Sequence, residues 1–411
     1  MENRNNIKSV NEVDIFSMTF FTLIFTLICV VALLVVRGAL FYYVSGDYWW
    51  FLRLWVEEYR TMTFLEGMRT NVGTYNPPYM YILNIIARIN VPFVNTISSD
   101  LFLIKIVSVI FDFILAFFVM KIVALRTTSA NMRALAFLAA FAIPTVILNG
   151  AMWGQCDSIY ATFAIGSFYF GLRGRSKMSY AFMALSLSFK LQAVFLMPIL
   201  AIFVFTNRIR LKDCYMFFLV YIATLLPAIL AGMPLVDAAF SYIVQANFYR
   251  GLNMNIVNMW RFFEQEHLSY HNFRLAGIFF AGFATLSLMF FTCVNRKRLI
   301  KIVDYVRLAY LFAIIIPFLL PKMHDRYYFI ADVLAVVVFF YDKRRWYVPV
   351  VTIFCSFLAY AFFLMGWVEL LDYRLAALAL LTVIIIVLRD FIMSIYPTRN
   401  EPSDALVEDI E

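Results

Sequence analysis

A small set of ionisable and amide side chains in this sequence stands beside long apolar segments, where polar groups are costly and are therefore candidates for function. The set comprises Asp47, Asp157, Lys190, Gln192, His324, Asp325 and Arg326. A carboxylate close to basic groups suits a reaction that removes a proton from one substrate and neutralises an anionic leaving group on another. If the chain brings these residues together, they can form one reaction site at membrane level.

All of these residues except Gln192 also have a purely structural interpretation. Asp47 and Asp157 can cap the helices that follow them. Lys190 can extend its ammonium group to the membrane surface, although it interrupts a run that is otherwise uncharged. Residues 324–326 can be an ordinary helix start with an acidic residue in the first turn. The two interpretations predict different partners for the same side chains.

The elements that must position these residues are membrane-spanning helices. Of the 411 residues, 64% are hydrophobic and 15% are charged, whereas soluble domains have about 45–50% and about 25% respectively. This composition excludes a water-soluble fold and predicts an all-α polytopic membrane protein, with residues 1–411 as a single domain. The net charge of +8 then concerns orientation in the membrane and does not indicate nucleic acid as a partner.

Long apolar runs predict the spans, because a helix needs about 20 mostly apolar residues to cross a bilayer. These runs lie near residues 14–36, 101–122, 133–150, 158–172, 178–206, 213–232, 274–294, 303–320, 327–341, 346–366 and 375–395. Short basic clusters fall on alternate connections, which the positive-inside rule places in the cytoplasm. Both flanks of 178–206 are basic, so we expect a hairpin that turns at residues 189–192. Two crossings there bring the total to about twelve spans, with both termini and the acidic tail 396–411 in the cytoplasm.

The first long external segment covers residues 37–100, and loops of this size usually carry function. Its residues 47–60 place four large side chains on one helical face, namely Tyr48, Leu52, Trp55 and Tyr59. We expect this helix to lie along the membrane surface with its aromatic rings at headgroup depth. Residues 79–87 are apolar enough to dip back into the membrane surface.

The second long external segment covers residues 233–273. Loops on a rigid scaffold usually carry specificity, so we expect the acceptor site here, with Tyr249, Arg250 and Trp260 as its candidate residues.

The order of several short motifs resembles a known family. These motifs are Asp47 in the first external segment, Tyr75-Asn76-Pro77-Pro78, Trp153-Gly154-Gln155-Cys156-Asp157-Ser158, Ser188-Phe189-Lys190-Leu191-Gln192-Ala193 and Lys322-Met323-His324-Asp325-Arg326-Tyr327. Over about residues 40–335 the chain resembles the bacterial polytopic transferases related to the second GPI mannosyltransferase. It is more distantly similar to the ER glucosyltransferases that extend lipid-linked oligosaccharide. Both groups belong to the GT-C class. The family usually has His-Glu-Arg-Tyr where this chain has residues 324–327, a change that keeps the carboxylate but shortens its reach.

The resemblance implies a GT-C fold whose first external loop forms interfacial helices of the active site. It also implies an inverting transferase that moves a hexose (mannose, glucose or galactose) from a polyprenyl-phosphate carrier to a glycan or glycolipid acceptor. In a bacterium, this reaction would take place on the outer face of the plasma membrane, in the assembly of cell-surface polysaccharide or glycolipid.

Roles follow residue by residue from the same resemblance. Asp47 is the expected general base. Arg326 and His324, with Asp325 between them and Lys190 as a further candidate, are expected to hold the phosphate. Asp157 and Gln192 are expected to contact sugar hydroxyls or position the basic residues. No metal or other cofactor is expected, because no His/Asp pair has metal-ligand spacing and basic side chains can hold a monophosphate.

Two other classes of function remain open at this point. The first is a transporter or flippase for a lipid-linked or small polar substrate, which also needs many spans and buried charges; Asp112 and Asp332 lie inside predicted spans. The second is a non-catalytic subunit of an assembly machine. Product formation in detergent, with no membrane to cross, separates an enzyme from a transporter.

Overall fold

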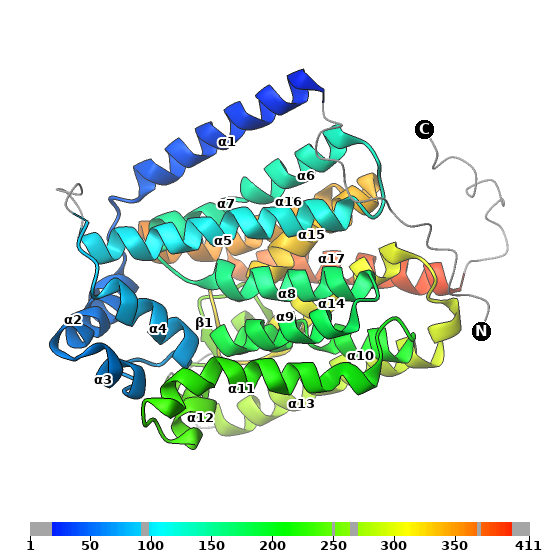
Figure 1. The fold of residues 1–411 in the computed structure, drawn as a ribbon. Helices are drawn as coiled ribbons and strands as arrows, with labels where there is room; N and C mark the ends of the chain where they lie inside the picture. Colours follow the sequence, from blue (N-terminus) through cyan, green and yellow to red (C-terminus); the bar gives the residue numbers. More distant parts are fainter. Residues whose placement is uncertain (1–18, 92–97, 249–250, 264–269, 368–370, 397–411) are drawn as a thin grey trace.

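The computed structural model describes residues 19–91, 98–248, 251–263, 270–367 and 371–396, and this part of the chain is almost entirely helical (Figure 1). The helices are α1 (Phe20–Leu40), α2 (Arg53–Thr61), α3 (Phe64–Arg69), α4 (Pro77–Ile86), α5 (Ser99–Val123), α6 (Ala130–Phe141), α7 (Pro144–Ile147), α8 (Asp157–Leu172), α9 (Ser176–Phe189), α10 (Pro198–Phe205), α11 (Tyr215–Leu230), α12 (Leu235–Phe248), α13 (Tyr270–Val294), α14 (Ile302–Leu319), α15 (Phe329–Tyr341), α16 (Tyr347–Met365) and α17 (Tyr373–Ile395). Two short strands, β1 (Asn253–Met254) and β2 (Met323–His324), pair in parallel. Single π-helical turns cover Tyr48–Leu52 and Leu148–Trp153. Short 3₁₀ turns cover Leu191–Phe195, Leu211–Cys214, Met259–Phe262, Arg296–Arg298 and Lys343–Arg345.

Seven helices in the described part of the chain are long and apolar enough to cross a membrane, or eight if one bent pair counts as a single span. They lie within Phe20–Leu40, Ser99–Val123, Leu211–Leu230, His271–Val294, Ile302–Leu319, Lys343–Met365 and Tyr373–Ile395. The prediction of an all-α polytopic membrane protein is confirmed in this form. The total of about twelve spans stays a prediction.

The run at residues 133–150 does not form the single straight span that its hydropathy predicts. It consists of α6 and the Pro144–Trp153 segment, bent by 52° relative to each other. Pro144 has no backbone N–H and cannot continue the ladder of α6. Arg37 of α1 satisfies one carbonyl at the break, because its Nη2 donates to the Phe141 oxygen at 2.7 Å.

The predicted reversal within residues 178–206 is confirmed. Helix α9 ends at Phe189, and Lys190 is extended at φ −148° and ψ 141°. The chain then returns through α10, so that the Arg210 N–H donates to Ser176 Oγ at 3.0 Å, beside the start of α9.

Helix α8 lies in the middle of the bundle and packs on α5, α9, α14 and α15. Small residues on α8 let its neighbours approach closely. At Gly171 the ring of Phe203 occupies the space of a side chain, since a Cβ there would lie 2.1 Å from the ring. A larger residue would therefore separate α8 from α10 and disturb a core that packs at crystal-like density.

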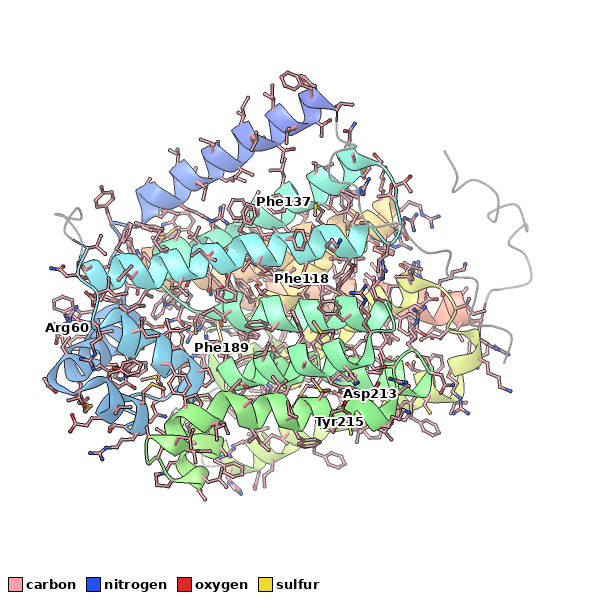
Figure 2. The ribbon with its side chains drawn as sticks, in the orientation of Figure 1. Arg60, Phe118, Phe137, Phe189, Asp213 and Tyr215 are labelled. Atoms are coloured by element: carbon pink, nitrogen blue, oxygen red, sulfur yellow. The ribbon has the colours of Figure 1, made fainter. Side chains whose placement is uncertain are left out.

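Helices α2, α3 and α4 lie together at one end of the bundle (Figure 1). In Figure 2, Arg60 of α2 lies at this end, whereas Asp213, which is flanked by the basic cluster 208–212, lies towards the other end. The first loop and the basic cluster 208–212 thus lie at different ends of the bundle, and the side of the membrane that each end faces stays a prediction.

The contacts of α2 and α4 differ from the prediction. Tyr48, Leu52 and Tyr59 do share one face, but they are buried against α4 and α5 and do not face lipid headgroups. Neighbouring Trp49 and Trp50 are exposed instead, at 49% and 67%. Helix α4 packs between α2, α3, α9 and α11, and its depth relative to the membrane surface stays a prediction. The apolar faces of this loop find protein partners, which hydropathy alone does not reveal.

Candidate functional site

Asp47 immediately precedes the first π-helical turn, in the segment that follows α1. Ser45 ties this segment to the second π-helical turn, because its hydroxyl donates to the Trp153 carbonyl at 2.7 Å. The same hydroxyl accepts the Tyr48 N–H at 3.2 Å. π-Helical turns are frequent at functional sites, and here two of them meet beside the candidate base.

The Asp47 carboxylate accepts two hydrogen bonds on one oxygen. Trp153 Nε1 and Gln155 Nε2 donate to Oδ2 at 2.9 and 2.6 Å, and Arg326 Nη1 lies 3.6 Å from the same oxygen. The side chain makes no helix-capping hydrogen bond, so the capping interpretation of Asp47 is wrong. The carboxylate remains 21% exposed, which leaves it accessible to a substrate.

Arg326 lies in the loop between α14 and α15, among three carboxylates. Its nitrogens are 3.6 Å from Asp47, 3.5 Å from Asp157 and 3.6 Å from Asp325. These separations are longer than a charge-assisted hydrogen bond, which is about 2.7–2.9 Å. Nε is buried and has no hydrogen-bond acceptor within the described residues. The guanidinium is thus held by charge but is incompletely hydrogen-bonded.

Lys190 forms a buried ion pair with Asp157. The Nζ–Oδ1 distance is 2.6 Å, and both side chains are 1% exposed. Asn149 Nδ2 donates to the other Asp157 oxygen at 2.8 Å, and the lysine lies beside the ring of Tyr75. The snorkelling interpretation of Lys190 is therefore wrong, and its ammonium already has a carboxylate partner.

Gln192 is buried just behind the pocket that Asp47 and Arg326 share. Its side chain hydrogen-bonds that of Tyr327, and its Oε1 has no partner within the described residues. Neither Gln192 nor the Lys190–Asp157 pair lines the pocket, so all three contribute from the layer behind Arg326.

The pocket itself opens between the first π-helical turn, α2 and the loop that carries Arg326. Its empty space is about 540 Å³, including the solvent-open space at its mouth. It is lined by Asp47, Phe51, Leu52, Trp55, Thr74, Tyr75, Gln155, His324, Arg326 and Tyr327. Aromatic rings and a few convergent polar groups therefore surround the Asp47–Arg326 pair.

His324 and Asp325 titrate abnormally because both are buried beside charges. Burial, with Arg326, Lys190 and Lys322 nearby, lowers the pKa of His324 to about 3. The imidazole is therefore neutral at physiological pH and can act on a phosphate through a hydrogen bond, not through charge. Burial raises the pKa of Asp325 to about 7; Arg326 opposes this shift, and Asp47 and Asp157 add to it. Residues 324–326 precede α15 as a strand and turn, so the helix-start interpretation is wrong.

The raised pKa of Asp325 predicts how stability depends on pH. Because the folded-state pKa is above the unfolded value of 3.8, the contribution to stability is fully present below pH 3.8 and is lost as pH rises through about 7. Asp325→Asn removes this loss. From pH 5 to pH 8, the melting temperature of the parent in detergent should fall by on the order of 2–5 °C more than that of the variant. If the variant and the parent had equal melting curves at both pH values, the prediction would be wrong. The control is Glu57→Gln, which changes an exposed carboxylate.

The described part of the second long external segment braces the loop of Arg326. Strand β1 pairs with β2, and the Asp325 N–H donates to the Met254 carbonyl at 3.0 Å. Asn258 Nδ2 donates to the carbonyls of Pro317 and Leu320 at 3.2 and 3.4 Å. These contacts fix the backbone that presents Arg326.

The acceptor-site residues are only partly described. Trp260 is 3% exposed, and its Nε1 donates to the Leu319 carbonyl at 2.9 Å. It therefore belongs to the same brace and does not line the pocket. Tyr249 and Arg250 lie outside the described residues, so their predicted role is not addressed by the structure.

The two aspartates inside spans have local partners. Asp112 pairs with Arg37 at 3.2 Å, with both side chains buried, and also accepts from the Ser158 hydroxyl. Asp332 accepts from Thr145 and Ser356 hydroxyls at 2.6 and 2.8 Å. Both carboxylates thus connect helices within the bundle.

Sequence reasoning missed the contacts of Trp153, Gln155, Tyr75 and Asn149, although the first three lie in motifs that it singled out. The available signal was the short polar segment 154–158 that follows the apolar run. No sequence pattern reveals that two side chains of this run meet Asp47, because the contact depends on Gly154, whose φ is +78°.

Comparison with known proteins adds nothing to this geometry: no protein-family model matches the chain, and no curated protein sequence matches it significantly.

Proposed function

We propose that this protein is an inverting GT-C glycosyltransferase that moves a hexose from a polyprenyl-phosphate carrier to a glycan or glycolipid acceptor. The observation that carries the proposal is the pairing of Asp47 and Arg326 in one open pocket. A carboxylate with an accessible edge faces a guanidinium whose Nε lacks an acceptor in the described structure. The base and the anion-binding group are 3.6 Å apart, so the donor sugar must enter between them for the acceptor to attack from the face opposite the phosphate.

The reaction assigns a step to each group. Asp47 takes the proton of the acceptor hydroxyl as its oxygen attacks the anomeric carbon. The bond from that carbon to the phosphate oxygen breaks, and the electron pair leaves with the phosphate. The leaving phosphate gains one negative charge, so Arg326 binds it more strongly in the transition state than in the ground state. Attack from the face opposite the phosphate inverts the anomeric centre.

Charge supports a monophosphate as the anion. Lys190 is neutralised by Asp157, and His324 is neutral because its pKa is lowered to about 3. Among the pocket-lining residues this leaves Arg326 as the cation that faces the donor, and its nearby carboxylates leave room for no more than a singly charged phosphate. In this proposal Lys190 and Asp157 position Arg326, and Gln192 positions Tyr327. These three residues therefore support donor binding through pocket-lining neighbours and do not contact the donor directly, unlike the direct roles expected from sequence.

The membrane setting follows from the same proposal. The pocket end of the bundle, with α2–α4, would face the external side of a bacterial plasma membrane, where lipid-linked donors are presented. The basic cluster 208–212 towards the other end supports this orientation, with both termini in the cytoplasm.

The test is a donor panel with the purified full chain in detergent. We expect one polyprenyl-phosphate hexose among mannose, glucose and galactose to be consumed, with release of polyprenyl phosphate and an inverted linkage in the product. Two further assays run in parallel. EDTA-treated enzyme tests whether a metal is needed, and polyprenyl-diphosphate hexoses test whether the carrier is a monophosphate. Consumption of none of the donors, together with substrate movement in proteoliposomes, would instead establish the transporter alternative.

A further inference from the structure

Trp153 and Gln155 both donate a hydrogen bond to the same oxygen of Asp47. In a helix, side chains two residues apart point to different sides, and Trp153 is the last residue of a helical turn. Gly154 between them has a left-handed φ of +78°, which L-residues with a Cβ rarely adopt. This turn brings the indole N–H and the amide N–H to Oδ2 at 2.9 and 2.6 Å.

Both donors are themselves held in place. The Tyr75 hydroxyl donates to Gln155 Oε1 at 3.2 Å, which leaves the amide nitrogen to face Asp47. The Ser108 hydroxyl donates to the Gln155 carbonyl at 2.6 Å. Trp153 is fully buried and stacks on Phe363, with ring centres 4.5 Å apart. Elements distant in sequence thus fix the two donors, a pattern typical of pre-organised sites.

The contacts divide the two carboxylate oxygens of Asp47. Oδ2 accepts both hydrogen bonds and is the oxygen nearest to Arg326. Oδ1 accepts no hydrogen bond from the residues that the structure describes. An oxygen with two donors is a poor proton acceptor, because its lone pairs are already engaged. The oxygen that can receive a proton is therefore Oδ1.

We propose that Trp153 and Gln155 are positioning residues that engage Oδ2 of Asp47 and leave Oδ1 to take the proton of the acceptor hydroxyl. This inference rests on the proposed function and specifies the base within it. Trp153 also links the base to the phosphate side of the site, since the Arg326 guanidinium lies 5.1 Å from the centre of its ring.

The test separates positioning of the base from binding of the donor. Gln155→Met keeps the length of the side chain but removes its hydrogen bonds, and Trp153→Phe removes the indole N–H but keeps a ring beneath Arg326. Each variant is expected to lower kcat by about 10-fold, the loss typical of one hydrogen bond to a charged group. Donor KM should change by less than about twofold, because Arg326 is untouched. Trp346→Phe, an exposed tryptophan, is the matched control and should leave both constants unchanged.

A double-mutant cycle supplies the second readout. If Gln155 acts through Asp47, Gln155→Met should cost nothing further in the residual rate of an Asp47→Ala protein. A further 10-fold loss there, or an increase in donor KM in place of the lower kcat, would overturn the inference. If Trp153→Phe fails to fold, Gln155→Met decides alone. The proposed function fails by a different result, namely full activity of Asp47→Ala itself.

Discussion

Asp47→Asn is expected to lower the rate of hexose transfer by about 10³-fold, within the range for loss of a general base. The amide occupies the same space, and its oxygen can still accept from Trp153 and Gln155, which now donate to Oδ2. It cannot accept the proton of the acceptor hydroxyl. The measurement is kcat for transfer from the polyprenyl-phosphate hexose identified by the donor panel, with donor KM determined on the same protein.

The loss should appear in kcat, because in the proposed mechanism Asp47 acts on the acceptor and not on the donor phosphate. Donor KM should stay equal or fall slightly, since removal of a carboxylate 3.6 Å from Arg326 leaves the guanidinium freer for phosphate. Asp237→Asn, the same change at an exposed position of α12, is the control and should retain full activity. An Asp47→Asn protein with undiminished kcat would remove the base from the mechanism.

The convergence of this site was predictable from sequence because each polar residue stands at the end of an apolar run. The bilayer places such ends at one level, and the positive-inside rule assigns them to the same face. Asp47, Asp157 and Arg326 therefore meet as expected, with adjacent members 3.5–3.6 Å apart. The reversal at Lys190 was predictable for the same reason, because both flanks of its run are basic.

Partner choice within the site was not predictable from sequence. Lys190 faces Asp157, because the extended backbone at residue 190 turns the side chain into the bundle. The role of the second external segment was also hidden, since the parallel pairing of β1 with β2 joins residues 70 positions apart. Hydropathy placed Tyr48 and Tyr59 at the membrane surface. Only the packed structure shows α4 and α5 covering them.

The two buried cations of the site should respond differently to removal. Arg326→Gln is expected to raise donor KM by about 100-fold, because truncating one partner of a buried charge pair costs about 2–5 kcal/mol. The value of kcat should fall as well, since the phosphate gains charge as it leaves. Arg326→Lys should recover only part of the affinity, because an ammonium cannot bind phosphate through two parallel N–H donors. Steady-state kinetics against donor concentration measure both Arg326 variants.

Lys190→Met is expected to act first on stability. It leaves the Asp157 carboxylate buried and uncompensated, which typically costs about 3–5 kcal/mol, and the melting temperature in detergent should fall accordingly. Asp157 would then draw Arg326 towards itself from its present 3.5 Å, so donor KM should rise too. The double variant Lys190→Met/Asp157→Asn removes both charges and should restore both the stability and the donor KM.

The double variant decides whether Lys190 or Arg326 holds the phosphate. A stable double variant with a donor KM within about threefold of the parent value, well below the 100-fold effect of losing a direct charge contact, would leave Arg326 as the phosphate-binding cation. A stable double variant whose KM stays as high as that of Arg326→Gln would mean that Lys190 reaches the phosphate itself. That result would require the Lys190–Asp157 pair, now closed at 2.6 Å, to open when the donor binds.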